Sequence, residues 1–240
     1  DPSIVNGAGK SLARDFGVQL SGVVDFVITR CKFMNFGEAG LNILHRDYLA
    51  RGLIYNNEFY HNMKGEDGLG TGYGIAVRGQ GLNWVDDPKY GTSNFIFIED
   101  NKFDFHRHSV ASGFCALYVA RYNTMLNNLI GHAVDMHGTP NLGSISARAS
   151  EIYNNILRND YLKFYPGLVP LTGSPENTSL SYIGIAVRGG ESLIYNNTIQ
   201  GFRYAVAVRA EFESADTSPY PKYTQIGYKS ALLYGSSDTG

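Results

Sequence analysis

Ile54-Tyr55-Asn56-Asn57 is a four-residue stretch that returns unchanged at positions 152–155 and 194–197 of this 240-residue chain. Looser copies end at Cys31, Asn101 and Asn128. The last residues of the six copies, 31, 57, 101, 128, 155 and 197, are separated by steps of 26, 44, 27, 27 and 42. A unit of about 27 residues explains this series if the long steps contain inserted loops, which we assign to residues 65–92 and 165–181.

A second stretch, Gly74-Ile75-Ala76-Val77-Arg78-Gly79, recurs unchanged at 184–189 and more loosely at 205–210, 133–138 and 40–44. Each copy is short, alternating and rich in β-branched residues, which predicts strands rather than helices. Units of this length with two or three short strands are typical of the coils of a β-solenoid. The sequence therefore predicts an all-β fold of about six stacked coils with two inserted loops.

Between Phe16 and Phe212 these repeats resemble the pectate-lyase-like superfamily of right-handed parallel β-helices. That family includes polysaccharide lyases, glycoside hydrolases, epimerases and phage tailspikes, so the fold alone does not fix the chemistry. We expect a single β-helix domain over residues 1–240. Residues 1–15 would start or cap it, residues 16–212 would form the coils, and residues 213–240 would be a capping or docking tail.

Composition limits the function classes. Hydrophobic residues make up 43% and charged residues 18%, which indicates a globular chain rather than a disordered one. A formal net charge of −2 without a basic stripe gives no indication of nucleic-acid binding. No apolar run reaches the roughly 18–20 residues of a membrane span. The sequence opens in loop-like residues at Asp1-Pro2 without a recognisable signal peptide, and we expect it to be a mature or excised fragment with other parts of a larger parent chain.

The repeated asparagines are expected to form a ladder at a tight corner, because asparagine tolerates left-handed geometry and its amide can bond its neighbours in adjacent coils. This prediction covers Asn57, Asn101, Asn128, Asn155 and Asn197. Cys31 occupies the same position in the first copy, and we expect both cysteines to be buried free thiols.

Four of the six histidines lie between positions 106 and 137. Strand alternation in residues 133–138 places Val134 and Met136 inside, and Asp135 and His137 outside. Stacking then aligns Asp135 with small alanines and forms an outward column of Arg78, His137, Arg188 and Arg209. A cationic stripe with a central carboxylate predicts binding of an acidic polysaccharide, because arginine holds carboxylates by paired hydrogen bonds.

We predict a polysaccharide site with His106, His108, Tyr118, Arg121, Asp135 and His137 as catalytic residues, and with Arg78, Arg107, Arg188, Arg209 and Tyr122 as substrate-binding residues. In β-elimination on a uronate, Arg121 or Arg107 would neutralise the substrate carboxylate, His137 or His108 would be the base, and Tyr118 would protonate the leaving oxygen. The excess of imidazole and guanidinium over carboxylate favours this reaction.

Two alternatives stay open. A glycoside hydrolase would pair Asp135 with a second carboxylate, either Asp104 or Asp100. A non-catalytic glycan-binding or tailspike-like module would instead use an aromatic face with Tyr118, Tyr122 and Trp84. The histidines do not have the spacing of a short zinc motif, and no carboxylate cluster indicates calcium, so we expect no cofactor.

The segments 106–123 and 132–138 also resemble β-helix proteins of methanogenic archaea and some bacteria, of which a disaggregatase is the example. That resemblance implies depolymerisation of a chondroitin-like, uronate-containing matrix outside the cell or at its surface. It assigns no catalytic residue.

Overall fold

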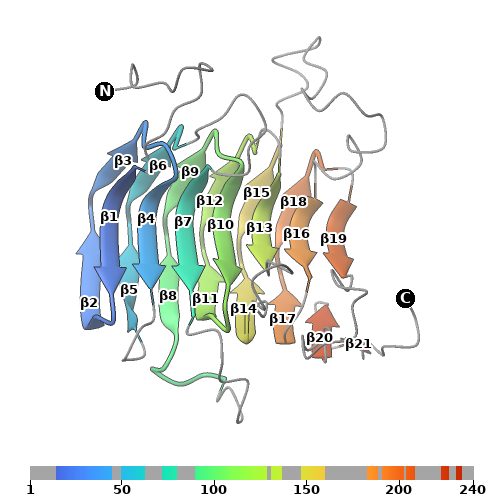
Figure 1. Ribbon diagram of the computed structural model, residues 1–240. Helices are drawn as coiled ribbons and strands as arrows, with labels where there is room; N and C mark the ends of the chain where they lie inside the picture. Colours follow the sequence, from blue (N-terminus) through green and yellow to red (C-terminus); the bar gives the residue numbers. More distant parts are fainter. Residues whose placement is uncertain are drawn as a thin grey trace, which may run out of the picture.

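The computed structural model describes residues 15–44, 50–62, 72–79, 90–128, 131–136, 147–159, 183–188, 191–202, 204–208, 223–226 and 231–233. These residues form an all-β structure of three sheets, in which the strands of each sheet are parallel except for one terminal pair. From β1 to β20 successive strands of the chain belong to different sheets, and within each sheet they stack in chain order along the molecule (Figure 1).

The seven-stranded sheet carries the segments with alternating residues. Its strands, in spatial order, are β1 (Phe16–Ser21), β4 (Ala39–Leu44), β7 (Tyr73–Arg78), β10 (His108–Gly113), β13 (His132–Met136), β16 (Ile183–Val187) and β19 (Tyr204–Val208). Residues 40–44, 74–78, 133–136, 184–187 and 205–208 of the predicted copies all lie in it. Comparison of the repeats missed two members, β1 and β10.

The two other sheets complete each turn of the chain. The eight-stranded sheet contains β2 (Val24–Thr29), β5 (Arg51–Tyr55), β8 (Ile96–Glu99), β11 (Leu117–Arg121), β14 (Ala149–Tyr153), β17 (Glu191–Tyr195), β20 (Tyr223–Ile226) and the antiparallel β21 (Ala231–Leu233). The six-stranded sheet contains β3 (Lys32–Met34), β6 (Glu58–Tyr60), β9 (Lys102–Asp104), β12 (Thr124–Leu126), β15 (Ile156–Arg158) and β18 (Thr198–Gln200).

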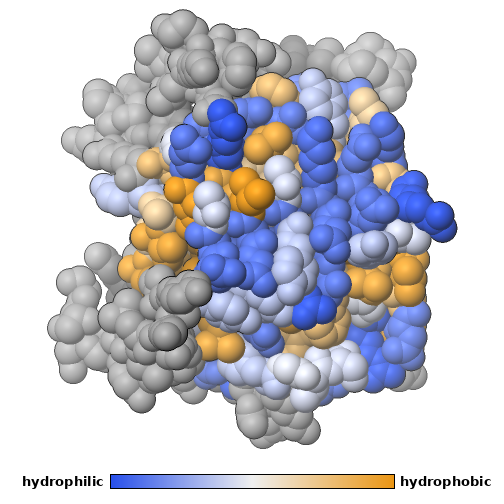
Figure 2. Space-filling view, turned by 180° about the vertical axis from the view of Figure 1, so that it is seen from behind, coloured by the Kyte–Doolittle hydropathy of each residue, from blue (hydrophilic) through white to orange (hydrophobic). Residues whose placement is uncertain are grey.

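The main hydrophobic core draws its side chains from all three sheets. Ile75, Val77, Val134 and Met136 belong to it, which confirms the predicted inward positions. In the six-stranded sheet Phe59 lies between two stacked neighbours, with ring centroids 5.0 Å from Phe33 and 4.8 Å from Phe103. Viewed from behind, the surface shows hydrophilic side chains over the middle of the face and apolar ones toward both sides (Figure 2).

The predicted asparagine ladder exists, with one wrong member. The backbone N–H of each residue donates to the amide oxygen of the next, in the order Cys31, Asn57, Asn101, Asn123, Asn155 and Asn197. Asn123 therefore occupies the position predicted for Asn128. The strand register decides this, because Arg121 pairs with Glu99 and Tyr153, so that Tyr122-Asn123 aligns with Asn56-Asn57.

Asn128 belongs instead to a second ladder, at the corner between the six- and seven-stranded sheets. There the members are Asn62, His106, Asn128 and Asn159, and each is in contact with the next.

Two further expectations were wrong. Residues 65–92 are not one loop, because they contain β7 with its buried Ile75 and Val77. Both cysteines are free as predicted, but Cys31 is exposed and Cys115 is half-buried.

Replacing Asn123 with alanine should lower the free energy of unfolding by about 2–3 kcal/mol. The substitution removes three hydrogen bonds of buried groups, namely those that Asn123 accepts from the backbone N–H and side-chain amide of Asn101 and the one that it donates to the carbonyl of Ile98. The side-chain amide of Asn101 keeps its bond to Ile54. Chemical denaturation followed by circular dichroism measures the change. Asn197→Ala is the matched control and should lose less than about 1 kcal/mol, because water can reach the half-buried end of the ladder. Equal losses at both positions would contradict this account.

The second predicted insert, residues 165–181, lies outside the described residues, as does almost all of the N-terminal segment 1–15. Within the segment assigned to the tail, β20 pairs in parallel with β17 and continues the eight-stranded sheet. Among the described residues no helix is long and apolar enough to cross a membrane.

Candidate functional site

The outer face of the seven-stranded sheet carries a charged cluster centred on Asp135. The register aligns Asp135 in one column with Asn42, Ala76, Ala111, Ala186 and Ala207, as alternation predicts. The small neighbours leave room for long side chains from adjacent columns. Asp135 is nevertheless fully buried, so it lies beneath other groups and is not an open groove floor.

Two side chains hold the Asp135 carboxylate. Arg188 directly follows β16 and donates from Nε to Oδ1 at 2.9 Å and from Nη2 to Oδ2. His108, the first residue of β10, places Nε2 3.3 Å from Oδ2. Arg188 is 8% exposed and His108 is 1% exposed. A buried charge is costly unless it is paired, so this arrangement fixes the three side chains as one unit.

His108 is neutral in this arrangement. The backbone N–H of His132 donates to Nδ1 of His108 at 2.9 Å, so Nδ1 acts as the acceptor and Nε2 carries the proton toward Asp135. Burial lowers the pKa of His108 well below its usual value, and the nearby Asp135 only partly opposes this effect. Because Nδ1 accepts from the backbone and Nε2 faces the Asp135 carboxylate, His108 is suited to positioning Asp135 rather than to removing a substrate proton.

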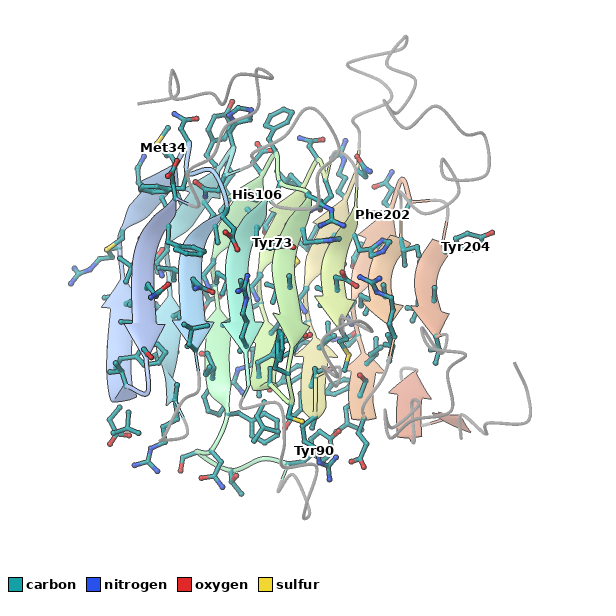
Figure 3. All side chains as sticks on the ribbon, viewed as in Figure 1. Met34, Tyr73, Tyr90, His106, Phe202 and Tyr204 are labelled. Atoms are coloured by element: carbon teal, nitrogen blue, oxygen red, sulfur yellow. The ribbon has the colours of Figure 1, made fainter. Side chains whose placement is uncertain are left out.

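Above this buried unit lie the side chains that solvent reaches. Tyr73, at the start of β7, is labelled in Figure 3. Its ring stacks on that of His108 with centroids 5.6 Å apart. Its hydroxyl accepts a hydrogen bond from Nη1 of Arg107 at 3.3 Å. Burial raises the pKa of Tyr73, while Arg107 acts in the opposite direction. Tyr73 therefore stays protonated at neutral pH and can donate its proton.

Arg78 lies at the other end of β7, and its Nη2 donates to Oε1 of the buried Glu38 at 2.8 Å. Arg78 and Arg188 do lie on the outer face, as predicted, but each is paired with a carboxylate. The predicted column also included His137 and Arg209, which lie outside the described residues. The structure thus brings together Glu38, Tyr73, Arg78, Arg107, His108, Asp135 and Arg188.

No protein-family model, no curated protein and no solved structure matches this chain. Among the described residues, no group of three or more His, Cys, Asp or Glu side chains is arranged to hold a metal ion.

Arg121 and Tyr122 are not part of the cluster around Asp135. Arg121 ends β11 in the eight-stranded sheet, where its guanidinium pairs with Glu99 and donates to the hydroxyl of Tyr153 at 2.6 Å. Tyr122 follows it at the corner of the chain and is 49% exposed. The two residues form a group of their own on a different face. They were assigned to the same site because they are close to the histidines in the sequence. Consecutive strands belong to different sheets, however, so closeness in sequence does not place the side chains on one face.

Tyr118 lies in the main hydrophobic core and has no solvent-exposed surface. Burial raises the pKa of its hydroxyl. Its strand, β11, pairs it with Ile96 and Ser150, and it therefore points into the interior. The structure does not place Tyr118 where it could protonate a leaving oxygen on the outer face, and Tyr73 is the hydroxyl available there.

His106 is a member of the second corner ladder and is fully buried. The backbone N–H of Asn62 donates to its Nδ1 at 3.3 Å, and the side-chain amide of Asn128 lies 3.5 Å from its carbonyl oxygen. Burial lowers the pKa of His106 to about 4. This position corresponds to asparagines in the neighbouring coils, which indicates a role in fixing the corner.

The lowered pKa of His106 predicts a pH-dependent stability. Between about pH 6.5 and pH 4 the unfolded chain binds a proton at this residue while the folded protein does not, so stability falls as the pH decreases. The slope should approach about 1.4 kcal/mol per pH unit for this residue. His106→Asn should remove that contribution in urea titrations across the range, whereas the part due to His108 should remain. An unchanged slope in the variant would contradict the assignment.

The second carboxylate proposed for hydrolysis is also absent from the cluster. Asp104 ends β9 in the six-stranded sheet and accepts a hydrogen bond from Asn127 at 2.9 Å. Asp100 is an exposed residue with a positive φ at the corner between the eight- and six-stranded sheets. Neither belongs to the seven-stranded sheet that carries Asp135. The carboxylate found there in addition to Asp135 is Glu38.

Tyr73, Glu38 and the part played by His132 were not predicted from the sequence. Alternation predicts that Tyr73 points inward, like Ile75 and Val77. At Gly74 the alternation is interrupted, because an added Cβ would point into the core and lie 2.6 Å from Phe103. Both Gly74 and Ile75 therefore face inward and Tyr73 faces outward. The glycine before the first buried residue is the signal that could have indicated this.

Proposed function

We propose that the chain is a right-handed parallel β-helix and that it depolymerises an acidic, uronate-containing polysaccharide outside the cell by β-elimination. Three sheets of stacked parallel strands support the fold part of this proposal, together with the strong preference of parallel crossover connections for the right-handed form. The resemblance to disaggregatase-type proteins supports a chondroitin-like substrate and an extracellular location, within a larger parent chain.

One observation carries the catalytic part of the proposal. The Asp135–Arg188–His108 unit is buried on the outer face of the seven-stranded sheet. The apolar core that stabilises this sheet is separate from the unit. Such a unit is weak evidence for stability, because its desolvation offsets much of its attraction. Buried, coupled ionisable groups next to accessible polar ones are common at functional sites. Here the accessible groups are Tyr73, Arg107 and Arg78.

The proposed reaction assigns a task to each accessible group. Arg107 and Arg78 bind the uronate carboxylate and neutralise it, which acidifies the ring proton beside it. A base removes that proton, the electron pair forms a carbon–carbon double bond, and the bond to the glycosidic oxygen breaks. Tyr73 donates its proton to the leaving oxygen. The base is His137, which follows Met136 in the chain and lies outside the described residues.

Elimination is favoured over hydrolysis by the carboxylates of this face. Glu38 directly precedes β4, and Asp135 lies in β13, three strand spacings away, or about 14 Å along the stack. Hydrolysis needs two carboxyl groups within about 5–9.5 Å of each other. In addition, Glu38 and Asp135 are each turned toward an arginine. Neither carboxylate is free to protonate a leaving group or to activate water.

A time course on chondroitin and on polygalacturonate tests the proposal, with ultraviolet absorbance and reducing ends followed together. Elimination creates an unsaturated uronate at each break, so both signals should rise in step, and both should be lost in His137→Ala. Reducing ends without absorbance would overturn elimination in favour of hydrolysis. No change in either signal would overturn the enzymatic proposal for these polymers.

A glycan-binding module is the second candidate, and one observation favours it. The Nδ1 of His108 accepts a hydrogen bond from the backbone and its Nε2 faces the Asp135 carboxylate at 3.3 Å, which leaves His108 poorly suited to act as a base. In that case Arg107, Arg78 and Tyr73 would hold a uronate without cleaving it. Retention of chondroitin on the immobilised protein, with neither signal of the time course, would support this candidate.

A further inference from the structure

A second surface with binding chemistry lies at the corner between the eight- and six-stranded sheets. At this corner each coil has a residue with positive φ, namely Arg30, Asn56, Asp100, Tyr122, Asn154 and Asn196. Four of the six are asparagine or aspartate, which tolerate the left-handed region better than other residues. Tyr122, with φ of 59°, is the aromatic exception at this corner.

Tyr122 is more exposed than the comparable aromatic residue at the other corner. Phe105 has a similar positive φ at the other corner, but it is half-buried and packs edge-on against Tyr60 with centroids 5.7 Å apart. Tyr122 is 49% exposed instead. A large side chain held in an unfavourable backbone conformation and turned to solvent indicates a function that outweighs its cost.

The neighbours of Tyr122 form a rigid support for its ring. The ring meets that of Tyr153 edge to face, with an interplanar angle of 79° and centroids 6.2 Å apart. Tyr153 in turn stacks on Tyr195 at 4.6 Å with an angle of 7°. The Tyr122 ring therefore lies across the direction of the stack, and it is displayed to solvent beside the partly exposed Tyr195.

A fixed guanidinium completes the surface. Arg121 lies 5.8 Å from the centroid of the Tyr122 ring and 5.4 Å from that of Phe97. Its hydrogen bonds to Glu99 and Tyr153 leave it little freedom to reorient. Aromatic faces, phenolic hydroxyls, a carboxylate and a guanidinium thus occur within one patch. We name this patch, formed by Glu99, Arg121, Tyr122, Tyr153 and Tyr195, the tyrosine platform.

We propose that the tyrosine platform is a second glycan-binding site, at which a sugar ring stacks on Tyr122 and its hydroxyls bond to the neighbouring polar groups. A sugar suits this patch because it has an apolar ring face and a polar edge, as the platform does. Coils repeat about every 4.8 Å, a distance comparable to one sugar residue, so a chain can follow the stack. The platform lies on a different sheet from Asp135, so it retains the polymer without cleaving it.

This inference rests on the proposed class of substrate but not on the cleavage reaction. Native affinity electrophoresis in gels containing chondroitin, polygalacturonate or dextran tests it directly. The wild-type protein should be retarded by at least one of these polymers. Tyr122→Asn should weaken that retardation by about three- to tenfold, the size expected for loss of one stacking contact. Tyr122→Phe keeps the ring and should retain most of the binding.

Stability separates a binding role from a structural one. Because asparagine suits the left-handed region, Tyr122→Asn should leave the melting temperature unchanged or raise it by ~2–4 °C. Tyr60→Asn is the matched control, an exposed tyrosine of the six-stranded sheet that is 41% exposed, and it should not change the retardation. A lower melting temperature with unchanged retardation in Tyr122→Asn would overturn the proposal, as would a wild-type protein that none of the three polymers retards.

The outcome is independent of the cleavage assay. Loss of retardation in Tyr122→Asn, without any cleavage by the wild type, would support the platform and refute the depolymerase. Cleavage by the wild type with normal retardation of Tyr122→Asn would do the reverse.

Discussion

Replacing Arg188 with methionine should lower the free energy of unfolding by about 3–5 kcal/mol. The substitution leaves the Asp135 carboxylate without its main partner at a position with no solvent-exposed surface. His108 cannot take over, because its Nδ1 accepts a hydrogen bond from the backbone of His132 and burial disfavours its protonated form. Urea denaturation followed by circular dichroism, compared with the wild type, measures the loss.

The double variant Asp135→Leu/Arg188→Met is the control for this prediction. Removing both charges removes the penalty of leaving one of them unpaired, so the double variant should recover most of the stability lost in Arg188→Met. It should not recover activity, because Asp135 holds His108, and Tyr73 stacks on the ring of His108. Equal stability of the single variant and the wild type would show that Asp135 finds another partner, and would contradict the buried unit described above.

The fold could be predicted from the sequence because its determinants are local and repeated. The asparagine at one corner and the alternating apolar residues after it recur along the chain. Each asparagine bonds its neighbours in the ladder, and each inward apolar residue packs in the core. The predictions were wrong where similarity in sequence and alignment by strand register disagree. Leu126-Asn127-Asn128 matches the repeat in letters, but the strand register aligns Tyr122-Asn123 with the ladder. The correct alignment was not evident from the spacing, because Asn123 is 22 residues from Asn101 and 32 residues from Asn155 instead of a constant distance from both.

The candidate site could be predicted only in part. Alternation correctly placed Asp135 and the alanines aligned with it, because that section of the strand is regular. It could not place Tyr73 outward, since the interruption at Gly74 changes the face of the residue before it. Nor could it reveal that Glu38 pairs with Arg78, because the two are 40 residues apart in the chain. The sequence also did not reveal that Arg121 and Asp135 lie on different sheets, because segments that are close in the chain belong to different sheets.

Replacing Tyr73 with phenylalanine should reduce kcat for polymer cleavage by about 10²–10⁴-fold, with a much smaller effect on KM. The substitution keeps the ring that stacks on His108 and removes only the hydroxyl that accepts from Arg107. A group that transfers a proton in the transition state contributes to kcat rather than to ground-state binding. The rise of ultraviolet absorbance on the polymer that the wild type cleaves gives both constants.

The hydroxyl also determines how this effect should depend on the substrate. If Tyr73 protonates the leaving oxygen, a substrate with a leaving group that needs no proton, such as a nitrophenol, should be cleaved by Tyr73→Phe nearly as fast as by the wild type. Tyr60→Phe, which alters an exposed tyrosine in the six-stranded sheet, is the matched control and should behave as the wild type on both substrates. A loss in Tyr73→Phe that is equally large on both substrates would show that the hydroxyl positions Arg107 instead. Uronate binding would then be the function of the pair, because the guanidinium that neutralises the carboxylate would depend on Tyr73 for its orientation.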